Sequence, residues 1–270
     1  MAKGVIASFL GMIVMACSAC GGDGNNPGVN PPTQSASKSV ASTCYVEGAK
    51  AGSACILDDQ ALARSVVQFG DSTRLKQVFE KARSGQPITI AAIGGSITQG
   101  AWATAPENRY VNRMFGWWQA TFPQSKMTLI NAGIGQTNSL YGQQRAQHDL
   151  FQYNPDFVIV EFANNDAITQ QMQDSMRSLI RMILDSPSHP AVMMLFTMAR
   201  DGTNSEDNQI PVGKEFNVPM VAVREAILPL EKSGQLDPVD ITADPIHPND
   251  LGHKILAQIV AYRLQSSLHE

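Results

Sequence analysis

The stretch from Ile88 to Gly100 reads ITIAAIGGSITQG, and the rest of the chain is best interpreted outward from it. Its first six residues are apolar or β-branched, which is typical of a parallel strand buried on both faces. The glycines that follow allow a sharp turn, which leaves the hydroxyl of Ser96 exposed at the carboxyl end of the strand. Ligands bind at this edge of open α/β sheets, so Ser96 is a candidate nucleophile if a base can reach it.

A base and a carboxylate to orient it are found near the other end of the chain. Asp244 and His247 are separated by two positions in the segment DPIHPN, which spans 244–249. Taken alone, a Gly-Gly-Ser turn is more typical of a phosphate-binding or plain tight turn. An isolated Asp-x-x-His pair is more typical of an incidental surface feature. Catalysis becomes the favoured interpretation because two further blocks accompany these two.

Strand-like and helix-like segments alternate along the chain. We expect strands at 88–93, 127–131, 157–161, 192–196 and 219–223, and helices at 72–84, 109–122, 169–184, around 213–216, and 249–267. This alternation predicts an α/β fold with helices on both faces of a parallel sheet. The expected architecture is a flavodoxin-like three-layer α/β/α fold with five parallel strands. Right-handed crossovers would place all their carboxyl ends on one edge.

Polar blocks follow several of these strands at that edge. Besides Ser96, they are NAGIGQTNS at 131–139, EFANND at 161–166, and DPIH at 244–247. Over roughly residues 70–265 the order and spacing of these blocks resemble the SGNH (GDSL-type) hydrolase superfamily. That superfamily is named for a catalytic Ser, Gly, Asn and His in four such blocks.

The resemblance implies an ester hydrolase with a Ser-His-Asp triad. Ser96 would attack the carbonyl carbon, His247 would carry the proton to the leaving alcohol, and Asp244 would orient the imidazole. The oxyanion hole would be formed by the backbone N–H groups of Ser96 and Gln136 and by the side chain of Asn165. Gly135 is the alternative to Gln136 if the loop register differs by one residue.

The chain departs from the family pattern at three positions. Gly95 stands where an Asp is usual, and Gln136 and Ala163 each stand where a Gly is usual. Every residue except proline has a backbone N–H, so the donor at position 136 can be retained. The glutamine side chain must nevertheless find room, and it would narrow the acyl pocket.

Two aromatic or imidazole side chains near these blocks have competing interpretations. His253 repeats the Asp-x-x-His spacing in the segment DLGH, but it lies in the first turns of the last helix, so we expect a structural role. Trp102 follows the serine turn and is a candidate for stacking on a sugar or lining the acyl pocket. Trp117 and Trp118 are expected to pack in the core.

Two acidic residues in the third block are expected to support it. Glu161 ends a buried strand, so we expect Arg145 or Arg200 to pair with it; its functional alternative is to orient the asparagine loop. Asp166 directly follows Asn165 and is expected to fix that loop through bonds to the backbone.

The composition limits the classes of partner. The chain has 270 residues, a length that suits one domain with a full core. Its net charge is −4 and its pI is about 5.7. Without a basic excess, a nucleic-acid partner is disfavoured. The chain shows neither a metal-ligand cluster nor a phosphate-cradling loop, so we predict no metal and no cofactor.

The N-terminal region is typical of export. A short apolar stretch, Val5–Ala16, follows Lys3 and precedes small residues and cysteines. We expect a lipoprotein signal peptide at 1–20 with lipidation at Cys20, or alternatively at Cys17. The other interpretation is an ordinary cleaved signal peptide. In either case the protein would be exported.

A flexible tether, rich in Gly, Asn, Pro and Ser, is expected at 21–43. A single hydrolase domain would then occupy 44–270. At its start Cys44 and Cys55 enclose a ten-residue loop, and in an oxidising compartment we expect them to form a disulfide.

These observations favour an exported serine esterase in the bacterial cell envelope, anchored to a membrane by lipid on its periplasmic or surface side. The resemblance implies that it removes short acyl groups, acetyl in particular, from carbohydrate. One alternative is a polysaccharide O-acetyltransferase that uses the same site. Another is a non-catalytic glycan-binding lipoprotein, which the intact Ser96, Asn165, Asp244 and His247 disfavour.

Overall fold

A computed structural model describes residues 57–270 of the chain. The expected signal peptide (1–20) and tether (21–43), the lipidation sites Cys20 and Cys17, and the Cys44–Cys55 disulfide lie outside the described residues. Within the described part, the structure contains no helix with the length and apolar character needed to cross a membrane.

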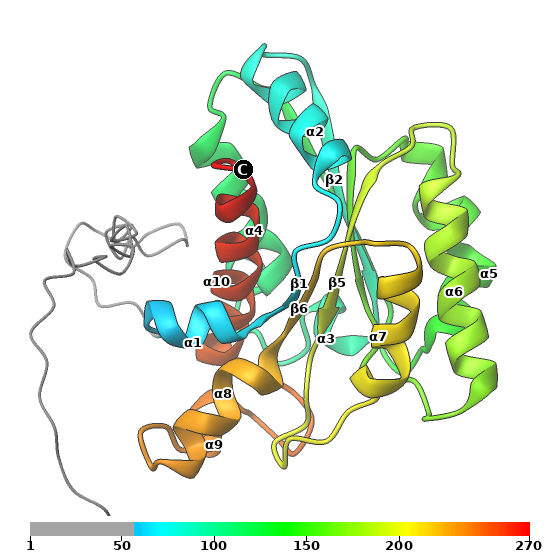
Figure 1. The fold of residues 1–270 in the computed structure, drawn as a ribbon. Helices are drawn as coiled ribbons and strands as arrows, with labels where there is room; N and C mark the ends of the chain where they lie inside the picture. Colours follow the sequence, from blue (N-terminus) through cyan, green and yellow to red (C-terminus); the bar gives the residue numbers. More distant parts are fainter. Residues whose placement is uncertain (1–56) are drawn as a thin grey trace, which may run out of the picture. The chain divides into compact units, whose positions relative to one another are not determined.

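A mostly parallel sheet forms the centre of the described residues (Figure 1). Its strand order is β1-β6-β5-β4-β2-β3. The strands are β1 (Val66–Gln68), β2 (Ile88–Gly94), β3 (Met127–Gly133), β4 (Phe157–Glu161), β5 (Ala191–Phe196) and β6 (Met220–Ala222). The five parallel strands are the predicted ones, and their order is that of flavodoxin-like sheets.

The predicted number of strands was wrong, because the sheet of the described residues has six. The additional strand, β1, pairs antiparallel with β6 at the edge of the sheet, with Val66 opposite Val221. Its sequence, VVQ, is too short to show an alternation of apolar and polar residues, and all three residues are half-buried.

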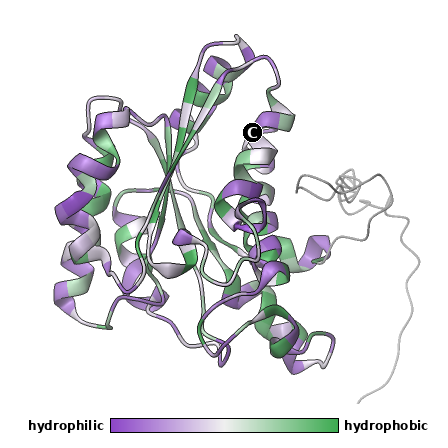
Figure 2. Ribbon diagram, turned by 180° about the vertical axis from the view of Figure 1, so that it is seen from behind, coloured by the Kyte–Doolittle hydropathy of each residue, from purple (hydrophilic) through white to green (hydrophobic). Residues whose placement is uncertain are grey.

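Helices cover both faces of the sheet (Figure 1). Alternate residues of β2 face opposite ways: Ile90 and Ala92 pack with the first helical layer, Ala91 with the second. Apolar residues therefore concentrate on the strands and on the inward sides of the helices (Figure 2). The first layer comprises α1 (Asp59–Arg64), α2 (Thr73–Arg83), α4 (Tyr110–Thr121), α8 (Val223–Lys232) and α10 (Asp250–Ser267), and the second α5 (Ser139–Asp149), α6 (Gln170–Leu184) and α7 (Glu206–Glu215).

The helices α5, α7 and α8 differ from the sequence prediction. The helix expected around 213–216 is α7, which begins at Glu206, while α1, α5 and α8 were not predicted. Proline lies inside two of them, Pro211 in α7 and Pro229 in α8, and proline disfavours a helix interior. The remaining short elements are α3 (Ser96–Gln99), α9 (Pro238–Ile241), and the 3-10 helices η1 (Pro106–Asn108) and η2 (Phe151–Tyr153).

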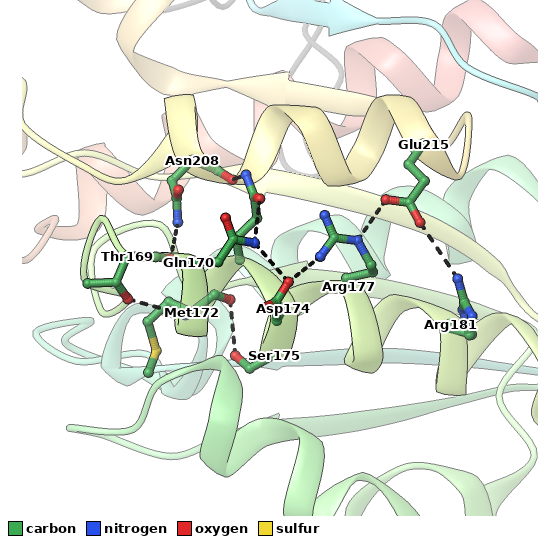
Figure 3. Close-up of polar contacts among 10 residues, drawn as sticks. Thr169, Gln170, Met172, Asp174, Ser175, Arg177, Arg181, Asn208 and Glu215 are labelled. Carbon is green, nitrogen blue, oxygen red and sulfur yellow. Dashed lines mark hydrogen bonds and ion pairs between the residues drawn. The ribbon is translucent and has the colours of Figure 1, made fainter.

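Polar side chains connect α6 to α7 (Figure 3). Arg177 of α6 donates to Glu215 of α7 at 2.7 Å and to Asp174 at 2.5 Å. At the other end, Asn208 donates to the carbonyl oxygen of Thr169 at 3.0 Å. Partly exposed pairs contribute little stability one by one, but together they fix how α7 lies along α6. The position of α7 is important for the site because Gln209 of α7 donates to Asp166 in the loop after β4.

Candidate active site

The turn after β2 places Ser96 at the first position of α3. Its carbonyl oxygen accepts from the backbone N–H groups of Gly100 at 3.0 Å and Ala101 at 2.9 Å. A Cβ on Gly95 would lie 2.2 Å from Oδ1 of Asn165. The glycine in place of the family's usual Asp therefore allows the Asn165 amide to lie against the peptide that precedes the serine.

The structure brings together the three residues predicted as a triad. Ser96 Oγ lies 2.9 Å from Nε2 of His247, whose Nδ1 lies 2.8 Å from Oδ2 of Asp244. The other oxygen of Asp244 accepts from the backbone N–H groups of Ile246 at 2.8 Å and His247 at 2.7 Å. The carboxylate is thus held by its own loop and aligned with the imidazole.

The carboxyl group of Asp244 stays ionised at neutral pH. Partial burial opposes ionisation, but hydrogen bonds from the His247 side chain and from two backbone N–H groups lower the pKa of Asp244 to about 2. An ionised carboxylate favours the proton on Nδ1 of the imidazole. This leaves the lone pair of Nε2 directed at Ser96 Oγ, as a general base requires.

His253 occupies a different environment. It is fully buried, its Nε2 donates to the carbonyl oxygen of Ala101 at 3.0 Å, and its Nδ1 accepts from the backbone N–H of Tyr110 at 3.4 Å. The structure thus brings Ser96 to His247 and places His253 behind the serine loop.

The stability of the protein should depend on pH through His253. Burial is the main cause that lowers the pKa of His253 below 6.5, with Arg113 adding to the effect and Asp250 opposing it. Below pH 6.5 the unfolded chain binds a proton that the folded chain refuses, so the free energy of unfolding falls until the pH reaches the folded pKa. His253→Gln should reduce this slope, measured by urea unfolding between about pH 7.5 and 5. If the free energy of unfolding depended equally on pH in both proteins, His253 would not be the source of the dependence.

The structure distinguishes the two candidate oxyanion donors in the loop after β3. The N–H of Gly135 already donates to the side chain of Gln99 at 3.0 Å. The N–H of Gln136 forms no hydrogen bond within residues 57–270, and Gln136 has a left-handed backbone with φ of 61°. Gln136 is therefore the available donor. Nothing in the sequence singled out Gln99, although it lies one helical turn after Ser96.

The loop after β4 holds Asn165 in place. The backbone N–H groups of Asn165 and Asp166 both donate to the carbonyl oxygen of Phe162 at 2.9 Å. The carboxylate of Asp166 accepts from the backbone N–H of Ser139 and from the side chain of Gln209, both at 2.8 Å. As expected, Asp166 fixes the loop partly through a backbone bond; the link to α7 through Gln209 was not expected.

Glu161, the last residue of β4, is hydrogen-bonded to the turn that carries Ser96. Its side chain is fully buried and accepts from the hydroxyls of Thr98 at 2.8 Å and Thr197 at 2.7 Å. Burial raises the pKa of Glu161, whereas these bonds and those from the backbone N–H groups of Gly95 and Thr98 favour the carboxylate. The contacts tie the end of β4 to the turn that carries Ser96.

The predicted arginine partner of Glu161 was wrong. Arg145 donates to Asp149 at 2.7 Å and to the carbonyl oxygen of Gly94 at 3.1 Å. Arg200 donates to the hydroxyl of Thr242 at 2.7 Å. Threonine hydroxyls satisfy the buried carboxylate instead, and their positions in separate segments gave no signal in the sequence.

An open cleft of about 480 Å³ lies beside this arrangement. It is lined by the two residues that flank Asn165 and by the two that precede His247. Its wall combines apolar side chains with amide, hydroxyl and carboxylate groups. Within residues 57–270 no cluster of three or more His, Cys, Asp or Glu side chains is suited to bind a metal ion.

Comparison with known proteins identifies the family of the chain. Residues 92–255 match the model of the GDSL-like Lipase/Acylhydrolase family. The chain therefore belongs to this family, which places it among the carboxylic ester hydrolases. The matched range includes all the residues that form the site described above.

Relatives of known structure and sequence lie in the same class. A two-domain esterase (CEX) active on acetylated mannans is 36% identical, with a TM-score of 0.76 over 77% of this chain, and the chain spans 57% of that esterase. Thioesterase 1/protease 1/lysophospholipase L1 of Escherichia coli K12 is 27% identical over 150 residues, which are 53% of this chain and 69% of that protein. The acetylxylan esterase Axe2 of Geobacillus stearothermophilus shares the fold, at 20% identity and a TM-score of 0.54 over 67% of this chain and 96% of that one.

Proposed function

We propose that the protein is a serine esterase that removes short acyl groups, acetyl in particular, from carbohydrate. The observation that carries the proposal is the chain of contacts from Ser96 Oγ through His247 to Asp244, at 2.9 and 2.8 Å. These three side chains supply a nucleophile, a base and a carboxylate that orients the base.

In the first half of the reaction, Ser96 Oγ attacks the ester carbonyl carbon while its proton passes to Nε2 of His247. The carbonyl oxygen becomes an oxyanion, which the N–H groups of Ser96 and Gln136 and the amide of Asn165 stabilise. When the tetrahedral intermediate collapses, the bond to the alcohol breaks, and the imidazolium returns its proton to the leaving oxygen.

In the second half, water attacks the acyl-serine ester. His247 accepts a proton from the water, and the same donors stabilise the second oxyanion. Collapse then releases the carboxylic acid and returns the proton to Ser96. The cleft beside His247 and Asn165 provides room for the alcohol portion, which leaves first.

The proposed acetylated carbohydrate substrate rests on the relatives. The mannan esterase is similar in sequence as well as in fold, at 36% identity. The family usually has Gly at position 136, and we propose that the larger side chain of Gln136 limits the room for the acyl group and favours a small one. The described residues contribute no long apolar segment that would cover the site as a lid for long acyl chains.

We further propose that the protein is exported and carries lipid on Cys20, with Cys17 as the alternative. The proposal rests on the apolar stretch and the small residues that precede these cysteines in the sequence. Mass spectrometry of the N-terminal peptide from membrane fractions tests it. An unmodified N-terminus on soluble protein would exclude the anchor.

The first test is hydrolysis of p-nitrophenyl acetate, butyrate and octanoate, together with acetylated mannan and xylan oligosaccharides. We expect acetate to be cleaved fastest and acetic acid to be released from the oligosaccharides. Fastest cleavage of octanoate would contradict the preference for short acyl groups. Transfer of acetyl to an added sugar, in preference to water, would favour the acyltransferase. A folded protein that binds glycan but cleaves none of these esters would be the non-catalytic form.

Removing the side-chain donor of the oxyanion hole should slow the chemical step. Asn165→Ala is expected to lower kcat by about 10²- to 10³-fold, because one preorganised donor to the oxyanion is lost. Asn208→Ala is the matched control, since it also removes a side-chain amide and a hydrogen bond, but on α7. Similar kcat values for the two variants would show that Asn165 does not act on the oxyanion.

A further inference from the structure

Exposed apolar side chains gather in the loops that carry the site. Residues 57–270 expose nine large hydrophobic side chains; four of them lie in these loops, and a fifth, Leu251, lies in the first turn of α10, which follows the loop that carries His247. Such grouping at one place on a surface marks a binding region more often than scattered exposure does. We call these five the apolar rim: Trp102, Ile134, Ile168, Ile246 and Leu251.

Trp102 is the largest side chain of the apolar rim. Its side chain is 60% exposed, whereas Trp117 and Trp118 are 5% and 0% exposed in the core. Its backbone is left-handed, with φ of 64°. A bulky residue rarely adopts this conformation, and such strain is retained where the surrounding structure enforces it, often at functional sites.

The surrounding structure does enforce the position of Trp102. On one side, the N–H of Ala101 donates to the carbonyl oxygen of Ser96 at 2.9 Å, and the Ala101 carbonyl accepts from buried His253 at 3.0 Å. On the other side, the backbone N–H and the hydroxyl of Thr104 donate to Asp250 at 2.9 and 2.5 Å. These bonds fix the backbone on both sides of Trp102, in a loop that is bonded directly to the backbone of Ser96.

The residue that anchors the Trp102 loop at Thr104 lies close to His247 in the sequence. Asp250, which holds Thr104, is the first residue of α10 and follows His247 by three positions. Trp102 therefore belongs to a loop bounded by the backbone of the serine on one side and by the segment that carries His247 on the other.

Given the proposed function, on which this inference rests, we propose that Trp102 is the stacking platform for a sugar ring of the acetylated substrate. A pyranose presents an apolar face of C–H groups and a polar edge of hydroxyls, and the flat face of an indole matches the former. A preorganised aromatic side chain loses little conformational entropy when it binds, so it contributes affinity at low cost. Trp102 would hold the sugar while its acetyl group reaches Ser96.

Kinetics on two substrates of different size test the platform. Trp102→Ala should raise KM for an acetylated mannopentaose by about tenfold, the effect of about 1.4 kcal/mol, which suits an aromatic contact. The ratio of kcat/KM on this substrate to that on p-nitrophenyl acetate should fall by a similar factor. Trp102→Phe, which keeps an aromatic face, should recover most of the loss.

Phe69→Ala is the matched control for losing an exposed aromatic ring. Phe69 is 55% exposed and follows β1 beside the amino-terminal end of β6, at the opposite edge of the sheet. We expect it to leave both substrates unaffected. An unchanged substrate ratio in Trp102→Ala would overturn the inference, as would a larger loss on p-nitrophenyl octanoate than on the oligosaccharide, which would make the apolar rim an acyl-chain site.

Binding measured without turnover separates this inference from the proposed function. In Ser96→Ala protein, quenching of tryptophan fluorescence by acrylamide reports mainly Trp102, because the chain has three tryptophans and the other two are buried. Saturating mannopentaose or acetylated mannopentaose should protect the fluorescence from quenching. Protection in Ser96→Ala, together with no ester hydrolysis by the wild type, would support the platform and refute the esterase. Hydrolysis by the wild type with no protection in Ser96→Ala would do the reverse.

Discussion

Ser96→Ala will lower kcat/KM for ester hydrolysis on the order of 10⁴- to 10⁶-fold. In the proposed mechanism the hydroxyl oxygen forms the acyl-enzyme, so its removal leaves only oxyanion stabilisation and substrate binding to assist attack by water. Ser96 is half-buried and its backbone, which carries the structural bonds to Gly100 and Ala101, is unchanged by the substitution. The fold should therefore be retained, as thermal unfolding will show.

The matched control for this variant is Ser233→Ala. Ser233 is exposed, and its hydroxyl donates to the carbonyl oxygen of Leu230 at 3.0 Å and to the side-chain oxygen of Gln235 at 3.1 Å, so a serine hydroxyl and its local hydrogen bonds are lost away from the site. We expect full activity from it. Substantial activity in a well-folded Ser96→Ala protein would refute the assignment of the nucleophile.

His247→Ala should reduce kcat/KM by a similar factor, and far more than His253→Ala does. The two histidines have the same Asp-x-x-His spacing, so this comparison tests the choice that the structure makes between them. Loss of His247 removes the base at 2.9 Å from Ser96 Oγ. Loss of His253 removes a buried side chain that bonds the backbone of the serine loop, so its main effect should be on stability.

The pH profile gives a second readout for His247. The imidazole must be neutral to accept the proton of Ser96, so kcat/KM should fall as the pH is lowered from about 8 to 5 and the base is lost. With a pKa of about 2, Asp244 stays ionised over this range and adds no limb of its own. A flat profile, or equal losses in His247→Ala and His253→Ala, would contradict the assignment.

The elements predicted from the sequence were those with a strong local signal. The strand that precedes Ser96 is a run of apolar and β-branched residues, and β4 and β5 are similarly apolar and buried. Their alternation with helices sufficed to predict the layered α/β fold. The blocks that follow the strands identified the residues of the site, because the topology of a parallel sheet brings its carboxyl ends to one edge.

Where the sequence prediction failed, the local signal was weak or pointed the other way. Three residues of β1 show no alternation, and Pro211 and Pro229 argue locally against the helices that contain them. The partner of Glu161 was assigned by charge alone. Burial of a carboxylate can instead be offset by hydroxyl donors, and threonines on two other segments provide them.

The sequence alone was sufficient to predict the layered fold, the nucleophile, and the histidine and carboxylate that accompany it, because these depend on strand patterns and on short motifs at strand ends. Only the tertiary structure decided between Gly135 and Gln136, since the answer depends on Gln99 reaching across from another segment to occupy the N–H of Gly135. The position of the loop that exposes Trp102 likewise depends on His253 and Asp250. Contacts between segments far apart in the chain are set by packing and hydrogen bonding, which no local pattern records.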